Sequence, residues 1–239
     1  MMEKFKYRSD KLELLDTTDI PKALLYKNLH ELDLLNKILG SNRISLNGII
    51  KLLVNKNKCY HIVDLGCGSG YTMRFIADWA RTKGIKVKLT GVDMNADTIN
   101  YLKEHCSEYP EIQTFTGDYR DFLKTNDDID IINCSLFCHH LKDEELTELF
   151  KWCQLKAKAG FVINDLQRNW MAYYLVQFFT LVFNASRLAK NDGPISVLRG
   201  FKKKELIVLL NKAQIKKYSI KRKWAFRFLI VGRSCNSDM

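Results

Sequence analysis

Residues 61–80 read HIVDLGCGSGYTMRFIADWA, and this stretch decides the fold class of the chain. An apolar run leads into three glycines, Gly66, Gly68 and Gly70, and then into a stretch with apolar side chains at helical spacing. Glycine permits positive φ and lets a ligand approach the backbone closely. The spacing is neither Gly-x-Gly-x-x-Gly nor a P-loop. The pattern predicts a buried strand, a tight turn that binds a ligand, and a helix; the alternative is an ordinary tight turn.

Strand and helix patterns alternate along the rest of the chain. Strands are predicted over residues 61–65, 87–92, 112–115, 129–136, 160–165, 215–220 and 226–231, and helices over 72–81, 96–105, 143–156 and near 203–212. This alternation indicates an α/β, Rossmann-like fold: a doubly wound, mostly parallel seven-stranded sheet with helices on both faces. The last two strands lie close enough in sequence to form a terminal antiparallel hairpin.

Two helical regions flank or interrupt this pattern. Residues 1–58 form a predicted N-terminal helical lobe, with one helix ending at Gly40 and a second over 44–54; the α/β domain then covers 59–239. A helical lid insertion is expected at about 167–200. Its apolar segment 170–183 is shorter than the roughly 20 residues that span a bilayer, so it is either a buried helix or a lid. The sequence Asp192-Gly193-Pro194 predicts a turn.

The charge of the chain is concentrated at its C-terminal end. The net charge is +11 over 239 residues, and from Arg199 onward 12 basic residues face two acidic ones. Such an end suits nucleic acid, an anionic membrane or an acidic substrate, or is simply a solvated helix face with lysine-bearing strand edges. Seven cysteines without paired spacing and no evident signal peptide lead us to expect a cytoplasmic protein with reduced thiols.

Three acidic residues follow the first three strands of the predicted sheet. Asp64 precedes the glycines, Asp93 ends the second strand, and Asp118 follows the third, with the ring of Tyr119 beside it. In an open α/β sheet a ligand lies beyond the carboxyl ends of the strands, where a carboxylate like Asp93 accepts hydrogen bonds from ribose hydroxyls. Asp118 is placed to meet an adenine amino group. The alternative for Asp93 is a helix N-cap.

The motifs VDLGCGSG, GVDMN, TGDY and DIDIINCSLFCHHL, taken together, resemble the class I S-adenosylmethionine-dependent methyltransferases, bacterial small-molecule methyltransferase-domain proteins in particular. The resemblance covers about residues 59–166 and implies S-adenosylmethionine as the cofactor. It implies that Asp64 meets the methionine amino group, Asp93 the ribose and Asp118 the adenine. The cofactor site it implies consists of Asp64, Gly66, Cys67, Gly68, Gly70, Asp93, Met94, Gly117, Asp118, Tyr119, Cys134 and Ser135.

The paired histidines after the fourth strand, His139 and His140, are the candidate catalytic residues. Many small-molecule methyltransferases have a similar pair there, and an imidazole can take a proton from a phenol or an acid. The alternative is that one histidine packs on the sheet and the other caps the helix at 143–156. Zinc bound by this pair with Cys134 and Cys138 is not expected, since four ligands within seven residues at a strand end point in different directions; we expect no metal.

The acceptor is predicted to be a hydrophobic or aromatic small molecule. The lid aromatics suit such a ligand, although they also fit a core between lid and sheet. Substrate contacts are expected from Arg168, Tyr173, Ser196 and Arg199, with the arginines holding a carboxylate or phosphate.

The overall prediction is methyl transfer to a hydroxyl or an activated carbon of this acceptor. The basic end would then dock an acyl carrier protein or an anionic membrane surface. An RNA or protein methyltransferase and a non-catalytic S-adenosylmethionine-binding protein are the alternatives. DNA is not expected, because the Asn/Asp-Pro-Pro-Tyr motif of amide-nitrogen methylation is missing. The oligomeric state stays open.

Overall fold

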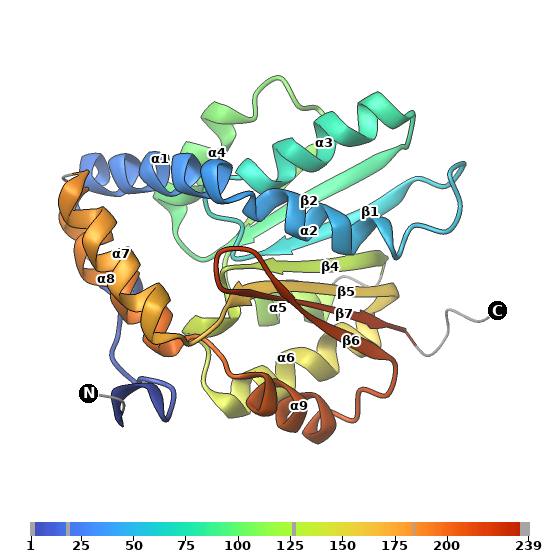
Figure 1. Ribbon diagram of the computed structural model, residues 1–239. Helices are drawn as coiled ribbons and strands as arrows, with labels where there is room; N and C mark the ends of the chain where they lie inside the picture. The colour runs from blue at the N-terminus through green and yellow to red at the C-terminus, as the bar shows by residue number, and fades with distance from the viewer. Residues whose placement is uncertain (1–2, 18–19, 126–127, 184, 235–239) are drawn as a thin grey trace.

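A seven-stranded sheet forms the centre of the computed structural model, which describes residues 3–17, 20–125, 128–183 and 185–234 (Figure 1). The strand order is β3-β2-β1-β4-β5-β7-β6. The strands are β1 (Tyr60–Leu65), β2 (Val87–Asp93), β3 (Ile112–Thr116), β4 (Ile129–Ser135), β5 (Ala157–Leu166), β6 (Tyr218–Lys223) and β7 (Arg227–Arg233). The first five are parallel, and β7 pairs antiparallel with both β5 and β6. The predicted mostly parallel sheet with a terminal hairpin is confirmed.

The chain reverses its direction across the sheet at β1. From β1 it proceeds outward through β2 to β3, and then returns to the other side of β1 as β4. Asp64 near the end of β1 therefore lies between Gly91 of β2 and Asn133 of β4. Ligands of open α/β sheets bind in the crevice at such a reversal, beyond the carboxyl ends of the strands. The topology thus places the glycine turn at the expected binding edge.

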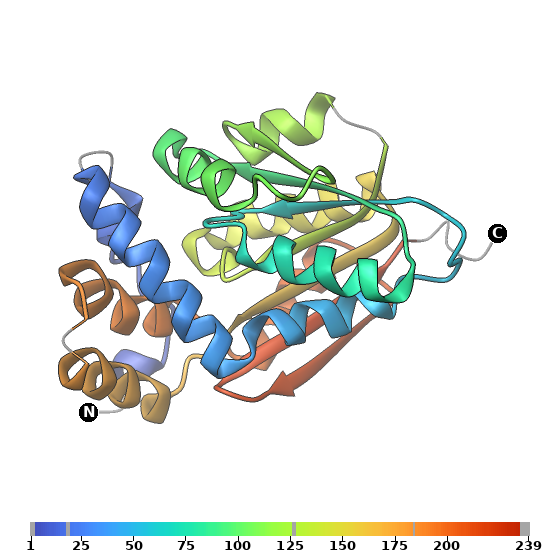
Figure 2. The same cartoon turned by 90° about the horizontal axis from the view of Figure 1, so that it is seen from above.

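Helices cover both faces of the sheet. One face carries α2 (Ser41–Ile50), α3 (Tyr71–Lys83) and α4 (Ala96–His105); the other carries α5 (Tyr119–Thr125), α6 (Asp143–Lys156) and α9 (Lys203–Lys212) (Figures 1 and 2). Successive strand residues point to opposite faces, so Ile131 and Ile132 of β4 enter different cores, and both are fully buried. This burial on two sides is why the central strands are continuous apolar runs.

Three further helices gather beyond the carboxyl ends of the parallel strands: α1 (Lys22–Leu39), α7 (Trp170–Val182) and α8 (Arg187–Arg199) (Figures 1 and 2). The predicted helix stop at Gly40 is confirmed, since Gly40 has φ 66° and joins α1 to α2. The N-terminal segment, with the short 3-10 helix η2 (Leu14–Asp16), packs against α8. These pieces surround the binding edge of the sheet.

The predicted turn at Asp192-Gly193-Pro194 is wrong, because all three residues lie inside α8. The Asp192 carboxylate accepts hydrogen bonds from the backbone N–H groups of Leu14 (2.7 Å) and Leu15 (3.0 Å). Gly193 packs on α7, where a Cβ would lie only 2.7 Å from Val176 Cγ1. Tertiary contacts on both sides of the segment thus outweigh its local turn preference. The second N-terminal helix also differs, spanning 41–50 instead of 44–54.

The apolar helix α7 is not buried. Its only buried residue is Ala172, whereas Trp170 and Phe178 are 51% and 58% exposed. The buried-helix interpretation is therefore wrong, and so is the interpretation of these two aromatics as core between lid and sheet. Within the described ranges, the structure has no helix that is both long and apolar enough to cross a lipid bilayer.

Candidate active site

The glycine turn between β1 and α3 has the backbone that its composition predicts. Gly66, Gly68 and Gly70 have φ values of 67°, 52° and 73°, a region that disfavours residues with a Cβ. A Cβ on Gly66 would lie 2.3 Å from the Phe137 ring, and one on Gly70 would lie 2.7 Å from Leu102. At Gly68, by contrast, no described atom lies within 4 Å of the same position. The outer two glycines thus serve packing as well as the turn, and the middle one leaves space for a ligand.

Cys67 and Ser69, between these glycines, anchor the turn. The Cys67 side chain is buried and lies against Gly91 of β2. The Ser69 hydroxyl donates a hydrogen bond to Asp33 of α1, and Asp33 also pairs with Arg74 of α3 at 3.3 Å. Helix α1 is therefore tied directly over the glycine turn, so the N-terminal helical region takes part in the predicted cofactor site.

The first two acids lie beside this turn. Asp64 is buried and accepts a hydrogen bond from Asn133 Nδ2 at 2.6 Å; burial raises the pKa of Asp64 to about 7. Asp93 accepts hydrogen bonds from the N–H groups of Gly68 (3.2 Å) and Asn95 (3.0 Å). The N-cap of α4 is Asn95, not Asp93. The helix-cap alternative for Asp93 is thus wrong, and its carboxylate instead holds Gly68 in place.

Asp118 and Tyr119 follow β3, the strand beyond β2 as seen from the glycine turn. Asp118 forms a bidentate pair with Arg120, which lowers the pKa of the Asp118 carboxyl. The Tyr119 ring packs edge-on against Phe137 at a centroid distance of 5.6 Å. Gly117 continues β3 and donates its N–H to Asp93 O at 2.9 Å. A contact of Asp118 with adenine would therefore have to share its carboxylate with Arg120. The buried Tyr119 hydroxyl has no hydrogen-bond partner among the described residues.

The remaining expected cofactor residues have different surroundings. Met94 is 77% exposed next to Asp93, and Ser135 at the end of β4 lies beside Asn164, whose Nδ2 is 3.4 Å from its hydroxyl. Cys134 is fully buried in the core under α6, together with Cys138. The two cysteines thus point into the core, and they lie outside the cluster of possible metal ligands in the described part of the chain. The Cys134 side chain is therefore not available to a cofactor.

The two histidines after β4 are each held by a carboxylate. His139 is buried, and its Nδ1 lies 2.7 Å from Asp165 Oδ1 of β5. His140 is partly exposed, and its Nδ1 lies 2.8 Å from Asp16 Oδ1 of η2. Although burial alone would raise the pKa of both acids, the histidines hold them below their usual range. An ionised carboxylate only accepts hydrogen bonds, so each Nδ1 carries a proton that it donates to its carboxylate.

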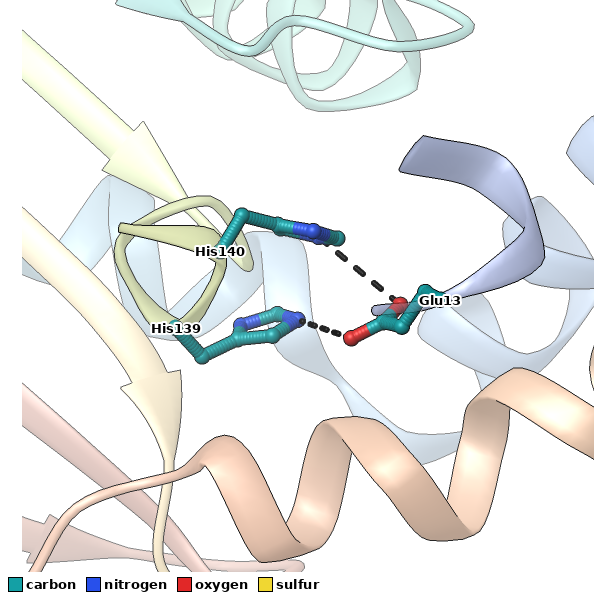
Figure 3. Close-up of side chains that lie close together, drawn as sticks. All are labelled: Glu13, His139 and His140. Atoms are coloured by element: carbon teal, nitrogen blue, oxygen red, sulfur yellow. Dashed lines mark ion pairs between the residues drawn. The ribbon is translucent and has the colours of Figure 1, made fainter. Parts of the chain in front are cut away.

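Both free Nε2 atoms face Glu13, which precedes η2 (Figure 3). Nε2 of His139 lies 3.7 Å from Glu13 Oε1, and Nε2 of His140 lies 3.9 Å from Oε2. Glu13 is 3% exposed, and burial raises its pKa to about 7. Neither histidine serves the alternative role of capping α6, whose N-cap is Lys142. The three residues form what we call the Glu–His–His cluster: Glu13, His139 and His140.

Sequence reasoning missed Glu13 and Asp16, and it did not pair Asp165 with a histidine. Glu13 and Asp16 lie more than 120 residues from His140, in a segment without a motif. Asp165 ends a predicted strand, which was a usable signal, because the carboxyl ends of neighbouring parallel strands meet at one edge of the sheet.

The two arginines expected at the substrate have occupied donors. Arg168 is buried and donates to the carbonyl oxygens of Phe5, Lys6 and Gly200, as well as to Glu205. Arg199 likewise donates to the carbonyls of Lys11, His139 and His140 and to Asp16. These contacts tie the N-terminal segment and the histidine turn to α8. The geometry therefore favours a structural role for both arginines over contact with an acceptor.

Tyr173 and Ser196, the other two expected substrate residues, lie on α7 and α8. The Tyr173 ring packs against Phe5 at 5.5 Å, with Lys4 Nζ 3.8 Å from its centroid. The Ser196 hydroxyl donates to Asp192 O at 2.9 Å and helps to stabilise the Glu13 carboxylate. Of the two, Ser196 is thus the one that the structure brings next to the Glu–His–His cluster.

The strand order, the glycine turn after β1 and the acids after β1 and β2 define the fold of the class I methyltransferases. Residues 62–160 match the family model of a methyltransferase domain. Residues 62–160 therefore form a methyltransferase domain, and the sheet that contains them has the class I methyltransferase fold. No curated protein matches the chain.

Solved structures of methyltransferases share the fold. The plantazolicin methyltransferase BpumL, in complex with SAH, has 13% identity over 89% of this chain and 95% of its own, with a TM-score of 0.65. A SAM-dependent methyltransferase from Aquifex aeolicus has 15% identity over 90% of this chain and 93% of its own, with a TM-score of 0.55. The magnesium protoporphyrin IX methyltransferase from Synechocystis PCC 6803 has 15% identity over 84% and 87%, with a TM-score of 0.54. The structure of the citrinin polyketide synthase CMeT domain has 13% identity over 77% of this chain, with a TM-score of 0.54. This chain spans only about half (49%) of that structure. At these identities the likeness is one of fold.

Proposed function

We propose that the protein transfers the methyl group of S-adenosylmethionine to a hydroxyl group of a hydrophobic small molecule that carries an acidic group. The observation that carries the proposal is the pair of histidines whose Nδ1 atoms are held by Asp16 and Asp165 at the cofactor edge of the sheet. Phe137, two residues before this pair, packs directly against Gly66 of the glycine turn. The Phe137 side chain thus links the histidine pair to the glycine turn, and an acceptor beside His140 would lie close to the proposed cofactor site.

Transfer to a hydroxyl forms a carbon–oxygen bond, breaks the carbon–sulfur bond of the sulfonium and releases the hydroxyl proton. The Nε2 lone pair of His140 is suited to take that proton, because its Nδ1–H is fixed on Asp16. His140 is the accessible histidine: its side chain is 25% exposed, against 4% for His139. Alignment of the acceptor with the methyl group supplies the rest of the rate enhancement.

The hydrophobic character of the acceptor is supported by α7, which lies beyond the cofactor edge of the sheet. Many apolar side chains on and next to this helix are at least 40% exposed: Trp170, Met171, Tyr174, Leu175, Phe178, Phe179, Leu181, Val182 and Phe183. Exposed apolar surface of this extent marks an interaction site in soluble proteins. An apolar acceptor, free or attached to a carrier protein or a membrane, would cover part of it.

An acidic group on the acceptor is supported by Arg227 at the start of β7. This residue is 3% exposed, and its Nε and Nη1 atoms have no hydrogen-bond partner among the described residues. Nη2 donates to Asn36 of α1 at 3.3 Å, so the side chain lies under the helix that covers the site. Burial lowers the pKa of Arg227 to about 10. The Asp165 carboxylate partly offsets the effect of burial on Arg227, but it accepts no hydrogen bond from Nε or Nη1. Unsatisfied donors on a buried cation are costly, and a carboxylate of the acceptor would supply the acceptors that they lack.

The basic C-terminal end keeps its two interpretations. Its exposed lysines lie on and next to α9, in the segment between α9 and β6, and on β6, which is an edge strand of the sheet. Lysines on an edge strand prevent pairing with other chains, and this accounts for part of the charge. Docking of an acyl carrier protein or an anionic membrane on this surface stays a prediction.

The proposal is tested in two stages. Thermal unfolding with S-adenosylmethionine, S-adenosylhomocysteine or NAD comes first; ligand at 100 times its Kd stabilises by about 2.7 kcal/mol, or roughly 5–10 °C at this size. Release of S-adenosylhomocysteine is then measured with hydrophobic phenols, with and without a carboxylate, and with RNA and a protein mixture. We expect turnover of the acidic phenols, at least tenfold reduced in His140→Gln. Turnover with RNA or protein alone would support the corresponding alternative, and cofactor binding without turnover of any acceptor would support a non-catalytic role.

A further inference from the structure

We propose that the Glu–His–His cluster binds a divalent transition-metal ion, with Glu13, His139 and His140 as its three protein ligands. The proposal deepens the proposed function of the same site. Its binding test does not require methyl transfer, so a failure of the metal proposal is distinguishable from a failure of the proposed function. It also revises the expectation from sequence that the protein holds no metal.

The ligand atoms of the cluster are slightly farther apart than they would be around a bound metal ion. One ligand atom from each residue lies within 4.8 Å of the others, and the two imidazole–carboxylate distances are 3.7 Å and 3.9 Å. Zn–N and Zn–O bonds of about 2.0–2.2 Å place ligand atoms roughly 3.0–3.5 Å apart. Side-chain movements of less than about 1 Å would therefore bring the two imidazole–carboxylate pairs to bonding positions.

The rings of both histidines are oriented for coordination through Nε2, because each Nδ1 is engaged by a carboxylate. Metal-bound histidines almost always donate their other ring N–H to a carboxylate, a carbonyl or water, which orients the ring and raises its basicity. Here His139 donates to Asp165 and His140 donates to Asp16. The Nε2 atoms of both rings point toward Glu13 (Figure 3). This is the arrangement found around bound metal ions, in which a carboxylate orients each histidine ligand.

An unpartnered buried oxygen gives a second, independent indication. Glu13 Oε1 has no hydrogen-bond partner among the described residues, although the side chain is 3% exposed. A buried carboxylate oxygen without a donor is costly to the fold. The Nε2 atoms of His139 and His140 lie 3.7 Å and 3.9 Å from the Glu13 oxygens, too far for a hydrogen bond. A cation between the three atoms would satisfy all of them.

The ligand set selects the kind of ion. Two neutral imidazoles and one carboxylate suit Zn²⁺, Fe²⁺, Co²⁺ or Mn²⁺, whereas Mg²⁺ and Ca²⁺ prefer oxygen ligands. Three protein ligands leave at least one position open, as in catalytic zinc sites. The acceptor hydroxyl fits that position, reached from the exposed side of His140. Coordination would lower the pKa of this hydroxyl, so His140 would then be a ligand and the proton would pass to solvent.

The experiment uses full-length protein freed of metal with a chelator. Zn²⁺ binding is measured by calorimetry, and Co²⁺ is titrated as a spectroscopic probe. The variants are Glu13→Gln and His140→Gln, with His105→Gln as the matched control, since His105 stacks on Tyr101 away from the cluster. Asp16→Asn tests the orienting carboxylate. Thermal unfolding without metal verifies that each variant is folded.

We expect one equivalent of each ion, visible d–d bands of nitrogen- and oxygen-coordinated Co²⁺, and unchanged binding in His105→Gln. Glu13→Gln and His140→Gln should weaken Zn²⁺ binding at least 100-fold, and Asp16→Asn about 10- to 100-fold. The proposal is overturned if folded Glu13→Gln binds as tightly as the unmodified protein, if no stoichiometric binding occurs, or if an intense thiolate-to-cobalt band assigns the ion to cysteines.

Discussion

Nδ1 of His139 lies 2.7 Å from Oδ1 of Asp165, and both side chains are almost completely buried. Asp165 lies in β5, and His139 follows β4, the neighbouring parallel strand. The sheet itself therefore holds the pair together. Asp165 Oδ2 also accepts the His139 backbone N–H at 3.2 Å. One carboxylate therefore fixes both the position and the tautomer of the histidine, before any ligand binds.

Removal of this carboxylate should destabilise the fold. We expect Asp165→Ala to lower the free energy of unfolding by about 2–3 kcal/mol, because two buried donors on His139 lose their acceptor. Denaturant unfolding measures the change. Asp121→Ala removes an exposed carboxylate whose ion pair, in the part of the chain that the structure describes, is with Lys124 at the surface. It should change stability by less than about 0.5 kcal/mol. Equal effects of the two substitutions would refute the structural role of Asp165.

Gly68 and Gly40 form a matched pair for the glycine turn. Both have positive φ (52° and 66°), and both have open space at the Cβ position among the described atoms. Alanine at either site should therefore cost a similar strain of about 1 kcal/mol, or a Tm decrease of roughly 2–4 °C. Gly68→Ala should in addition weaken S-adenosylmethionine binding at least tenfold, because the new methyl group fills the space left for the ligand. Calorimetric Kd values test this: equal cofactor affinity in both variants would exclude Gly68 from the binding site.

Asp64 should couple cofactor binding to pH. The folded-state pKa of Asp64 is raised to about 7 from 3.8, so the folded protein holds a proton on this carboxyl at pH values where the unfolded chain has lost it. This group thus contributes stability below pH 3.8, and the contribution is lost as the pH rises toward 7.

The ammonium group of S-adenosylmethionine would favour the ionised carboxylate and expel that proton. The Kd should therefore fall up to about tenfold per pH unit between about pH 5 and 7, and then level off. Calorimetry in buffers of different ionisation enthalpy should detect proton release in this range. Asp64→Asn should abolish both the release and the slope. A wild-type Kd without pH dependence would contradict the role of Asp64 at the amino group.

Arg227 should show opposite effects on stability and on acceptor binding. Replacing a buried, incompletely paired charge by an apolar side chain of similar length is often neutral or stabilising by about 1–4 kcal/mol, so Arg227→Met should unfold at the same or a higher temperature. The same variant should raise KM for acidic acceptors more than tenfold, with little effect on their neutral esters. A large loss of stability, or equal losses for acid and ester, would show that Arg227 serves the fold instead.

Much of the sheet was predictable because its signals are local. The helices at 96–105, 143–156 and 203–212 have the boundaries that their apolar periodicity predicts, and the strands differ from prediction by at most three residues at either end. Central strands are apolar runs because they are buried on both faces, and positive φ selects glycine at the turn. Where long-range contacts decide, as at Asp192-Gly193-Pro194, the local pattern predicted the wrong structure.

The sequence by itself determined the α/β fold, the glycine turn and the acids beside it, since strand burial, helix periodicity and backbone conformation act between near neighbours in the chain. Only the tertiary structure decided what surrounds the histidines. Glu13 reaches them because two residues of α8 bind the segment around it. Arg199 donates hydrogen bonds to Lys11 and Asp16. Asp192 accepts hydrogen bonds from the N–H groups of Leu14 and Leu15. These contacts join segments more than 170 residues apart, and no periodicity or spacing within either segment encodes which carboxylate will face which imidazole.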